Sequence, residues 1–295
     1  MAQSIAPQQL RQPAPHKTQR LGKVSLLLAY ALLFAWAILS LFPRYWMLVT
    51  SLKEGQNVMR LPPELWPSAP SLQNYHALFR RGDVLRWLFN SAFMSLAVTG
   101  GHVLFGAMAG YAFAKKLFPG RDILFWLLLA SIMVPGWTTI IPLYMLVASL
   151  DWLNTYQGLI VPSLASAGAM FLMKQSMSTL PSELLDAARI DGASEPGIFW
   201  RIVLPLSKPG LAVLSIFTFV SVWNDFTWPL FITSQSTMRT FQVGLTLLYQ
   251  TEYNHDADYG LLMAGASIAA IPVVGLFVFL QRYFLQGVTL GALKG

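Results

Sequence analysis

LPSELLDAARIDGASEPGIFWRIVLPLSKPGL, residues 180–211, is a polar stretch between two long apolar segments. A helix is expected to begin at Ser182 as its N-cap, because a serine hydroxyl can accept a hydrogen bond from an N–H of the first turn. Gly192 is expected to end this helix in a left-handed turn. Pro196 fits the first turn of a second short helix, which ends at Pro205. The stretch therefore predicts two short helices joined by a glycine bend, a shape suited to docking into a groove on a partner protein.

The side chains around this bend are arranged by helical spacing. Leu184, Ala187 and Ala188 share a face of the first helix, and Phe199 shares a face of the second with Ile202. We expect the small residues near the bend, and Phe199 as an aromatic knob beyond it, to enter the partner's groove.

The composition is that of a membrane protein. Of 295 residues, 55% are hydrophobic and 11% are charged, and the mean hydropathy is +0.52. This is enough apolar sequence for about six membrane helices of roughly 20 residues each. The net charge of +7 is explained by basic loops at the membrane surface, so no nucleic-acid partner is expected. The sequence has no cysteine, which excludes disulfides and thiolate chemistry.

Apolar runs and loop composition divide the chain into a tail, a first span, an external loop and a core of five spans. The expected segments are an N-terminal tail 1–23, a first transmembrane span 24–50, an external loop 51–86, a five-helix core 87–285 that contains the coupling loop 178–208, and a C-terminal tail 286–295. The fifth span is expected to run from Pro209 to about Ile232, with an external loop to Asp258 after it.

The distribution of basic residues predicts the orientation. The tail, the Lys115–Arg121 turn, the polar stretch together with Lys174, and the C-terminal region from Arg282 lie on one side and carry 13 of the 20 lysines and arginines. Since cytoplasmic loops hold the excess of such residues, both termini and the polar stretch are expected to be cytoplasmic.

The usual catalytic constellations are missing from the sequence. Its four histidines form no HExxH pair, and neither a Gly-x-Ser-x-Gly elbow nor a Walker A loop occurs. Paired carboxylates for acid–base catalysis are absent from the expected spans. The sequence thus predicts no enzyme, no metal site and no cofactor in this chain.

One carboxylate, Asp225, falls inside an expected span. Such groups usually face a bundle interior or an aqueous cavity, so Asn224 and Asp225 can line a translocation path; alternatively, the fifth span ends early and Asp225 lies at the interface. Candidates for stacking on sugar rings are Trp223, Trp228, Tyr144 and Trp137. Aromatic packing and membrane-interface anchoring explain the same residues, and the ten tryptophans spread along the chain favour that explanation.

The polar stretch also resembles a known motif, the EAA loop of ABC importer permeases. The residues that carry the resemblance are Asp186, Ala187, Ala188, Asp191, Gly192, Ala193, Phe199, Ile202, Leu204 and Pro205. The similar subgroup is the second membrane subunit of carbohydrate importers of the maltose and glycerol-3-phosphate type. This chain departs from the motif at Asp186, where glutamate is usual, which keeps the charge on a shorter stem.

The resemblance implies an all-α membrane protein with six transmembrane helices and the type I ABC importer permease fold, in the bacterial inner membrane. It implies a second homologous permease, two cytoplasmic ATPase subunits that bind MgATP, an extracytoplasmic solute-binding protein and a sugar-like solute. In that family the EAA loop is the coupling helix that inserts into the ATPase. Two alternatives stay open: a permease for a glycerol phosphodiester, polyol or acidic oligosaccharide, and a channel or ion-coupled carrier without an ATPase.

Overall fold

The computed structural model describes residues 23–53, 62–252 and 259–292. The predicted tail 1–22, part of each external loop and the last three residues lie outside these ranges. The chain separates into two compact units, 1–46 and 47–295. Helix α1 (Lys23–Ser51) covers the expected first span and crosses the boundary between the units, and its part in the first unit exposes apolar side chains such as Leu27 and Trp36. Such a surface suits lipid.

The second unit is a bundle of helices, and no β-strand occurs in its described residues. Two of its helices are long and apolar enough to cross a membrane without a break, α3 (Val84–Lys115) and α14 (Tyr259–Ala292). Pro272 lies within α14 without ending it. The helix continues to Ala292, so the predicted C-terminal tail, 286–295, begins inside it.

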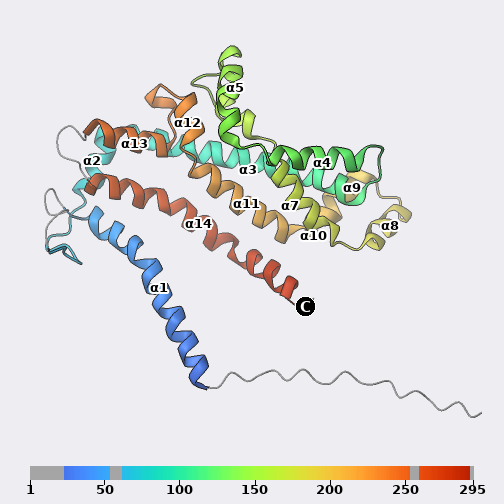
Figure 1. Ribbon diagram of the computed structural model, residues 1–295, viewed down its shortest axis with the longest axis horizontal. Coiled ribbons are helices and arrows are strands. Elements are labelled where there is room, and N and C mark those ends of the chain that lie inside the picture. Colours follow the sequence, from blue (N-terminus) through green and yellow to red (C-terminus); the bar gives the residue numbers. More distant parts are fainter. Residues whose placement is uncertain (1–22, 54–61, 253–258, 293–295) are drawn as a thin grey trace, which may run out of the picture. The chain divides into compact units, whose positions relative to one another are not determined.

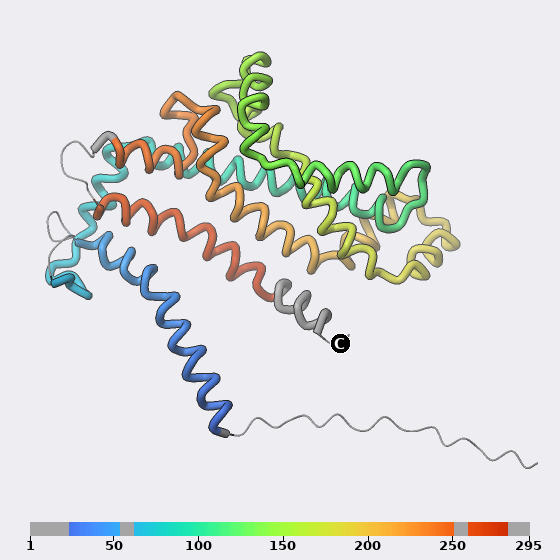
Figure 2. The backbone as a smooth tube through the Cα atoms, in the orientation of Figure 1, coloured from blue at the N-terminus to red at the C-terminus, as the bar shows by residue number. Residues whose placement is uncertain are grey.

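Three further spans are bent pairs of helices, which brings the possible total to the expected six. Helices α4 (Arg121–Ile132) and α5 (Gly136–Ser149) meet at 96°, the corner seen in Figure 2. The break falls at Pro135, whose ring disfavours helical geometry in the residue before it. The second pair joins α6 (Tyr156–Ile160) and the 3-10 turn η2 (Val161–Ser163) to α7 (Ala167–Ser178) at 44°.

The third bent pair joins the predicted docking stretch to a span. Helix α11 (Lys208–Trp223) lies at 76° to the helical segment Glu195–Leu206 before it. The fifth span ends at Trp223 rather than near Ile232, because the chain breaks at 224–226 before the short helix α12 (Thr227–Ile232). The 76° bend separates α11 from the segment Glu195–Leu206, which belongs to the polar stretch 180–211.

Close packing of α3 against α7 and α11 builds the bundle. A Cβ added to Gly110 would lie 2.6 Å from Met173 Cβ, and one added to Gly106 would lie 3.0 Å from Ala169 Cβ. Glycines let two helix backbones approach in this way. Gly106 and Gly110 therefore have a packing role, whereas Gly100 has no such neighbour within 4 Å.

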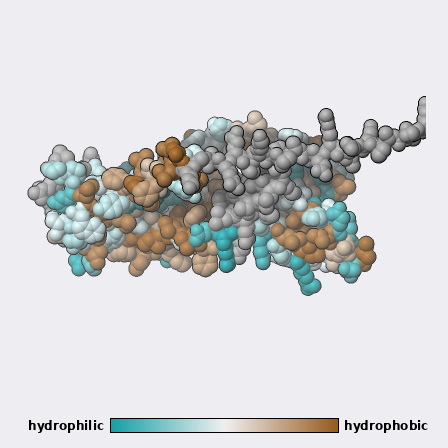
Figure 3. All heavy atoms as spheres, turned by 90° about the horizontal axis from the view of Figure 1, so that it is seen from below, coloured by the Kyte–Doolittle hydropathy of each residue, from teal (hydrophilic) through white to brown (hydrophobic). Residues whose placement is uncertain are grey.

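The two ends of the second unit carry different short elements (Figure 1). At one end lie α2 (Gln73–Arg81), the 3-10 turn η4 (Ser236–Met238) and α13 (Phe241–Glu252); at the other lies α8 (Ser182–Ile190). Both sequence segments predicted as external loops therefore contain a helix. In the space-filling view, hydrophobic surfaces extend over much of the visible face (Figure 3), as expected of a lipid-facing protein.

Candidate functional site

The predicted glycine bend is present. Gly192 has φ = 80°. Its N–H donates to Arg189 O (3.0 Å), and Ala193 N–H donates to Ala188 O (2.9 Å). These two bonds are those of a Schellman motif, which satisfies the last carbonyls of a helix through a left-handed residue. The α8 helix therefore ends where the sequence predicts, in a geometry that favours glycine.

The start of α8 differs from the prediction. Pro181, not Ser182, is the N-cap residue, and no side chain caps this helix. The Ser182 hydroxyl instead accepts from Lys115 Nζ (3.4 Å), which also donates to Leu180 O (2.5 Å). The serine cap belongs to the second helix, where Ser194 Oγ accepts from a backbone N–H at the start of α9 (Glu195–Ile198).

The inner face of the stretch packs against its own bundle. Leu185, Phe199 and Val203 are buried in a cluster with residues of α3, α7 and α11. The Phe199 ring lies 5.6 Å from that of Tyr111, centroid to centroid, and is only 7% exposed. The prediction that Phe199 is a knob for a partner is therefore wrong, because the ring fills a hole in its own subunit. Ile202, Leu204 and Ala188 are half-buried against the same cluster.

The second helix of the stretch contains a π-turn. Between α9 and α10 (Leu204–Leu206), η3 (Phe199–Val203) has the wider hydrogen-bond spacing, with Leu204 N–H donating to Phe199 O. Pro205 has no N–H to continue the ordinary ladder and clashes with the carbonyl four residues before it. The π-turn accommodates this residue, and the helix continues to Leu206, one residue beyond the predicted end.

The outer face of α8 is exposed and carries apolar side chains beside the carboxylates of Glu183 and Asp186. Leu184 and Ala187 lie exposed on it, and Ile190 at its end is 86% exposed. Asp186 and Asp191 flank this row and are also exposed. These residues, rather than Phe199, form a surface that another protein can cover.

Charged groups brace the bend. Arg189 binds Asp186 (Nη1–Oδ1 2.5 Å) and Glu195 (Nε–Oε1 3.0 Å). The other Glu195 oxygen pairs with Lys116 and accepts from Tyr111 Oη (3.1 Å). These hydrogen bonds lower the pKa of Glu195 to about 2, and the bond from Lys116 contributes most. The bond to Glu195 is the main cause of a raised pKa at Arg189.

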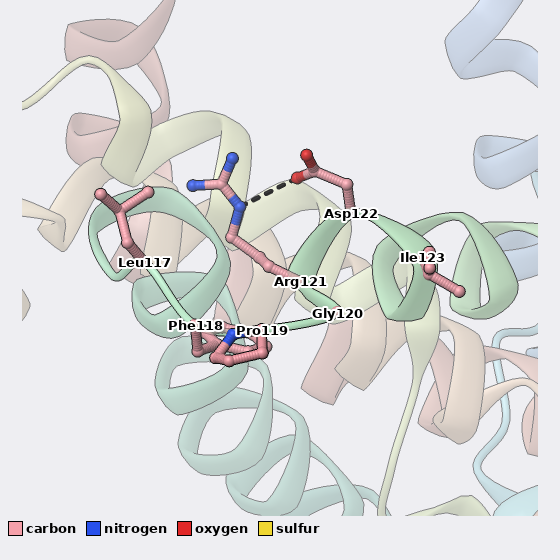
Figure 4. A pocket seen from close by; sticks show the side chains of 7 residues that line it. All are labelled: Leu117, Phe118, Pro119, Gly120, Arg121, Asp122 and Ile123. Atoms are coloured by element: carbon pink, nitrogen blue, oxygen red, sulfur yellow. Dashed lines mark hydrogen bonds and ion pairs between the residues drawn. The ribbon is translucent and has the colours of Figure 1, made fainter.

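The turn between α3 and α4 lies beside this network. It forms an open hollow of about 620 Å³ lined by Leu117 to Ile123, with Arg121 bound to Asp122 (Nε–Oδ1 2.9 Å; Figure 4). Leu117 is 89% exposed. Because Lys116 precedes this turn and pairs with Glu195, the turn and the bend are tied together.

This network of ion pairs and hydrogen bonds, which we call the brace, was not predicted from the sequence. Glu195, Arg189, Lys116 and Tyr111 lie on three elements up to 84 residues apart, so no local spacing connects them. The one local signal is the three-residue separation of Asp186 and Arg189 on a helix.

Asp225 lies in the break between α11 and α12. Its Oδ1 accepts from the backbone N–H groups of Thr227 (3.0 Å) and Trp228 (3.4 Å). Asn224 is exposed and donates from Nδ2 to Val220 O (2.8 Å). Helix α11 therefore ends before Asp225, whose carboxylate caps the break.

The predicted aromatic candidates separate into two groups. Trp223 is 2% exposed and donates from Nε1 to Ala269 O (3.0 Å), so its ring packs α11 on α14 and is closed to a solute in this structure. Trp228 and half-buried Tyr144 belong to one cluster, with Trp228 Nε1 donating to Gly158 O (3.1 Å). Trp137 is 73% exposed.

His102 is a packing residue. Its Nε2 donates to Ser163 O (2.8 Å), which leaves Nδ1 to accept from Thr218 Oγ1 (3.1 Å). A neutral histidine bonded to neighbouring helices, as expected, accounts for both contacts.

Comparisons with known proteins agree with this architecture. Residues 102–290 match the family described as "Binding-protein-dependent transport system inner membrane component". The chain is 37% identical to the "Arabinooligosaccharides transport system permease protein AraQ" of Bacillus subtilis, over 92% of this chain and 96% of that protein. It is 36% identical to the "sn-glycerol-3-phosphate transport system permease protein UgpE" of Yersinia enterocolitica, over 88% and 94% respectively.

A solved structure has the same fold. It is described as a bacterial ABC transporter involved in the import of the acidic polysaccharide alginate, and one of its chains matches with a TM-score of 0.79 at 20% identity. The match covers 92% of this chain and all of that one.

Proposed function

Because the chain belongs to the family of binding-protein-dependent transport system inner membrane components, we propose that it couples solute import to an ATPase through the outer face of α8. The family match and the structural likeness confirm the expected all-α importer permease fold and the role of an importer permease subunit. The exposed row Leu184, Ala187 and Ile190 carries the coupling proposal, since it is an apolar surface next to a braced bend.

The division of α8 into two faces supports this assignment. Leu185 anchors the helix on its own bundle, and Arg189 and Glu195 hold the bend, so the outer face is presented in one orientation. When the ATPase groove that receives Ala187 shifts, it therefore displaces α8. MgATP is bound and hydrolysed on two such ATPase subunits, and this chain supplies no catalytic group.

The remaining parts of the assembly follow from the same role. A second homologous permease completes the translocation path, and an extracytoplasmic binding protein delivers the solute. In the orientation that the basic residues predict, both termini and α8 are cytoplasmic. The end with α2 and α13 then faces the binding protein.

We propose a sugar or oligosaccharide as the solute, since a relative that covers nearly the whole chain is named for arabino-oligosaccharides. A phosphorylated polyol is the second candidate, because other relatives are named for sn-glycerol-3-phosphate.

The coupling role is tested with Ala187→Asp in the purified complex. The substitution places an unpaired carboxylate in the contact, and leaving such a group unsatisfied costs about 1–3 kcal/mol or more. We expect ATPase stimulation by loaded binding protein to fall about tenfold or more, with expression unchanged because Ala187 is exposed. Ala187→Ser, small and uncharged, is the control. Normal stimulation and normal ATPase association in Ala187→Asp would contradict the proposal.

A further inference from the structure

A cavity of about 390 Å³ lies where interrupted helices of the second unit meet. We call it the break cavity. Its lining comes from the start of α5, after the break at 133–135, from the end of η2, before the break at 164–166, and from the break at 224–226. The lining residues are Gly136, Trp137, Thr139, Ile140, Leu143, Ser163, Asp225, Thr227 and Trp228.

The convergence of these breaks is informative. Non-helical backbone at membrane depth is tolerated only where protein buries it or where it lines a water-filled cavity. Solute sites of transporters are typically formed by such discontinuous helices. A cavity bounded by the interruptions of two bent spans and by the break that follows α11 is therefore a place where a solute can meet this subunit.

Among the described residues, the lining of the break cavity contains one acidic residue and no basic residue. Asp225 is the only ionisable residue among the described residues that line it. Its Oδ1 is occupied by the N–H groups of Thr227 and Trp228, whereas Oδ2 has no hydrogen-bond partner in the described part of the chain. That oxygen is left to accept a hydrogen bond, and the absence of a lining lysine or arginine leaves its negative charge unbalanced.

The rest of the lining suits a sugar. Trp137 is 73% exposed and offers an indole face for the apolar side of a sugar ring. Trp228 is fixed by its bond to Gly158 O and forms a rigid part of the wall. Hydroxyls of Thr139, Thr227 and Ser163 lie among these apolar groups, the mixture of apolar walls with a few polar groups that small-molecule sites use.

We propose that the break cavity contacts the transported solute and favours a neutral, polyhydroxylated one, with Asp225 accepting hydroxyl hydrogen bonds and opposing anionic groups. The inference rests on the proposed function and narrows it. Of the two solute classes above, it selects the neutral oligosaccharide over the phosphorylated polyol.

The absence of cysteine makes a direct test possible. Thr139→Cys places a thiol in the cavity lining, and Thr138→Cys is the matched control. Both threonines are exposed on α5, and both hydroxyls bond to the carbonyl three residues before them. Only Thr139 lines the cavity. In the full complex in proteoliposomes, each thiol is labelled with a cationic and an anionic methanethiosulfonate of similar size.

The expected result is a faster cationic reaction at Thr139→Cys, by roughly tenfold for one charge at close range in a partly aqueous site. Asp225→Asn should remove most of that preference, because asparagine keeps an oxygen for the two N–H groups and loses the charge. The ratio of the two rates at Thr138→Cys should change little. An unchanged ratio at Thr139→Cys in the Asp225→Asn background overturns the assigned role of Asp225.

Solute contact is measured as protection of the same thiol. Neutral trisaccharides (arabinotriose, maltotriose and xylotriose) are compared with trigalacturonate, which has the same length and three carboxylates. At least one neutral sugar should slow labelling at Thr139→Cys by several-fold and leave Thr138→Cys unchanged. Protection by none of them, or equal protection by trigalacturonate, overturns the inference. If the chain still co-purifies with an active ATPase, the proposed function stands despite that result.

Discussion

Replacing Gly192 by alanine tests whether the shape of the bend carries the coupling. Gly192 has φ = 80°, and a Cβ added there meets nothing within 4 Å. The substitution therefore adds no clash, and its effect is purely conformational. An L-residue in the left-handed region costs roughly 1–2 kcal/mol relative to glycine. Alanine also lowers the entropy of the unfolded chain, which offsets about 0.4–1 kcal/mol of the effect on stability.

The same strain acts directly on the bend. If 1–2 kcal/mol is relieved by opening the turn, the ratio of the bend with both Schellman bonds to the opened bend falls about 5- to 30-fold. We expect stimulation of the ATPase by loaded binding protein to fall by several-fold in Gly192→Ala. Gly192→Asn should retain most of the stimulation, because asparagine tolerates the left-handed region.

Gly120 provides a matched control. It has the same φ of 80° and the same open surroundings, but it caps the start of α4 and lies outside the bend. Gly120→Ala should lower stability by a similar amount and leave ATPase stimulation near the native level. Equal loss of stimulation in Gly120→Ala and Gly192→Ala would refute the reasoning, as would full stimulation in both.

Three further outcomes follow from the structure. Gly110→Ala should lower thermal stability in detergent by about 1–3 kcal/mol through overpacking, whereas Gly100→Ala, with no neighbour within 4 Å, should not. Glu195→Gln should weaken the brace by about 1 kcal/mol or less, since the carboxylate is 47% exposed. The pKa of Glu195 in the folded protein, about 2, lies below the ordinary 4.5. The contribution of this carboxylate to stability is therefore present above pH 4.5 and is lost as pH falls toward 2. Cysteine at Ser194 should be shielded from an impermeant reagent outside intact cells and cysteine at Ser236 should react, and the reverse pattern would invert the assigned orientation.

Local signals predicted the features that depend on neighbours in sequence. The bend at Gly192 follows from one residue type at the end of an amphipathic helix, and the structure has it. The break at Pro135 also has a local cause, because the proline ring disfavours helical geometry in the residue before it. The long spans α3 and α14 follow from apolar runs of sufficient length.

Features that depend on distant residues could not be predicted. Phe199 has the spacing of an exposed helical face, and only the position of Tyr111, 88 residues earlier, shows that its ring is buried. Trp223 and Trp228 have similar sequence surroundings, yet one packs on α14 and the other lines a cavity. Asp225 was ambiguous because a carboxylate that lines a path and one that caps a break have the same local sequence.

The glycine contacts along α3 have a mechanical consequence. Gly110 lies so close to Met173 on α7 that no side chain fits between the two helices at this point. Met173 and Met177 also belong to the cluster that holds Leu185 and Phe199. A displacement of α8 is therefore transmitted to α3 and α7 through this cluster, since tightly packed cores transmit strain. The interrupted spans are the places where the backbone can bend in response.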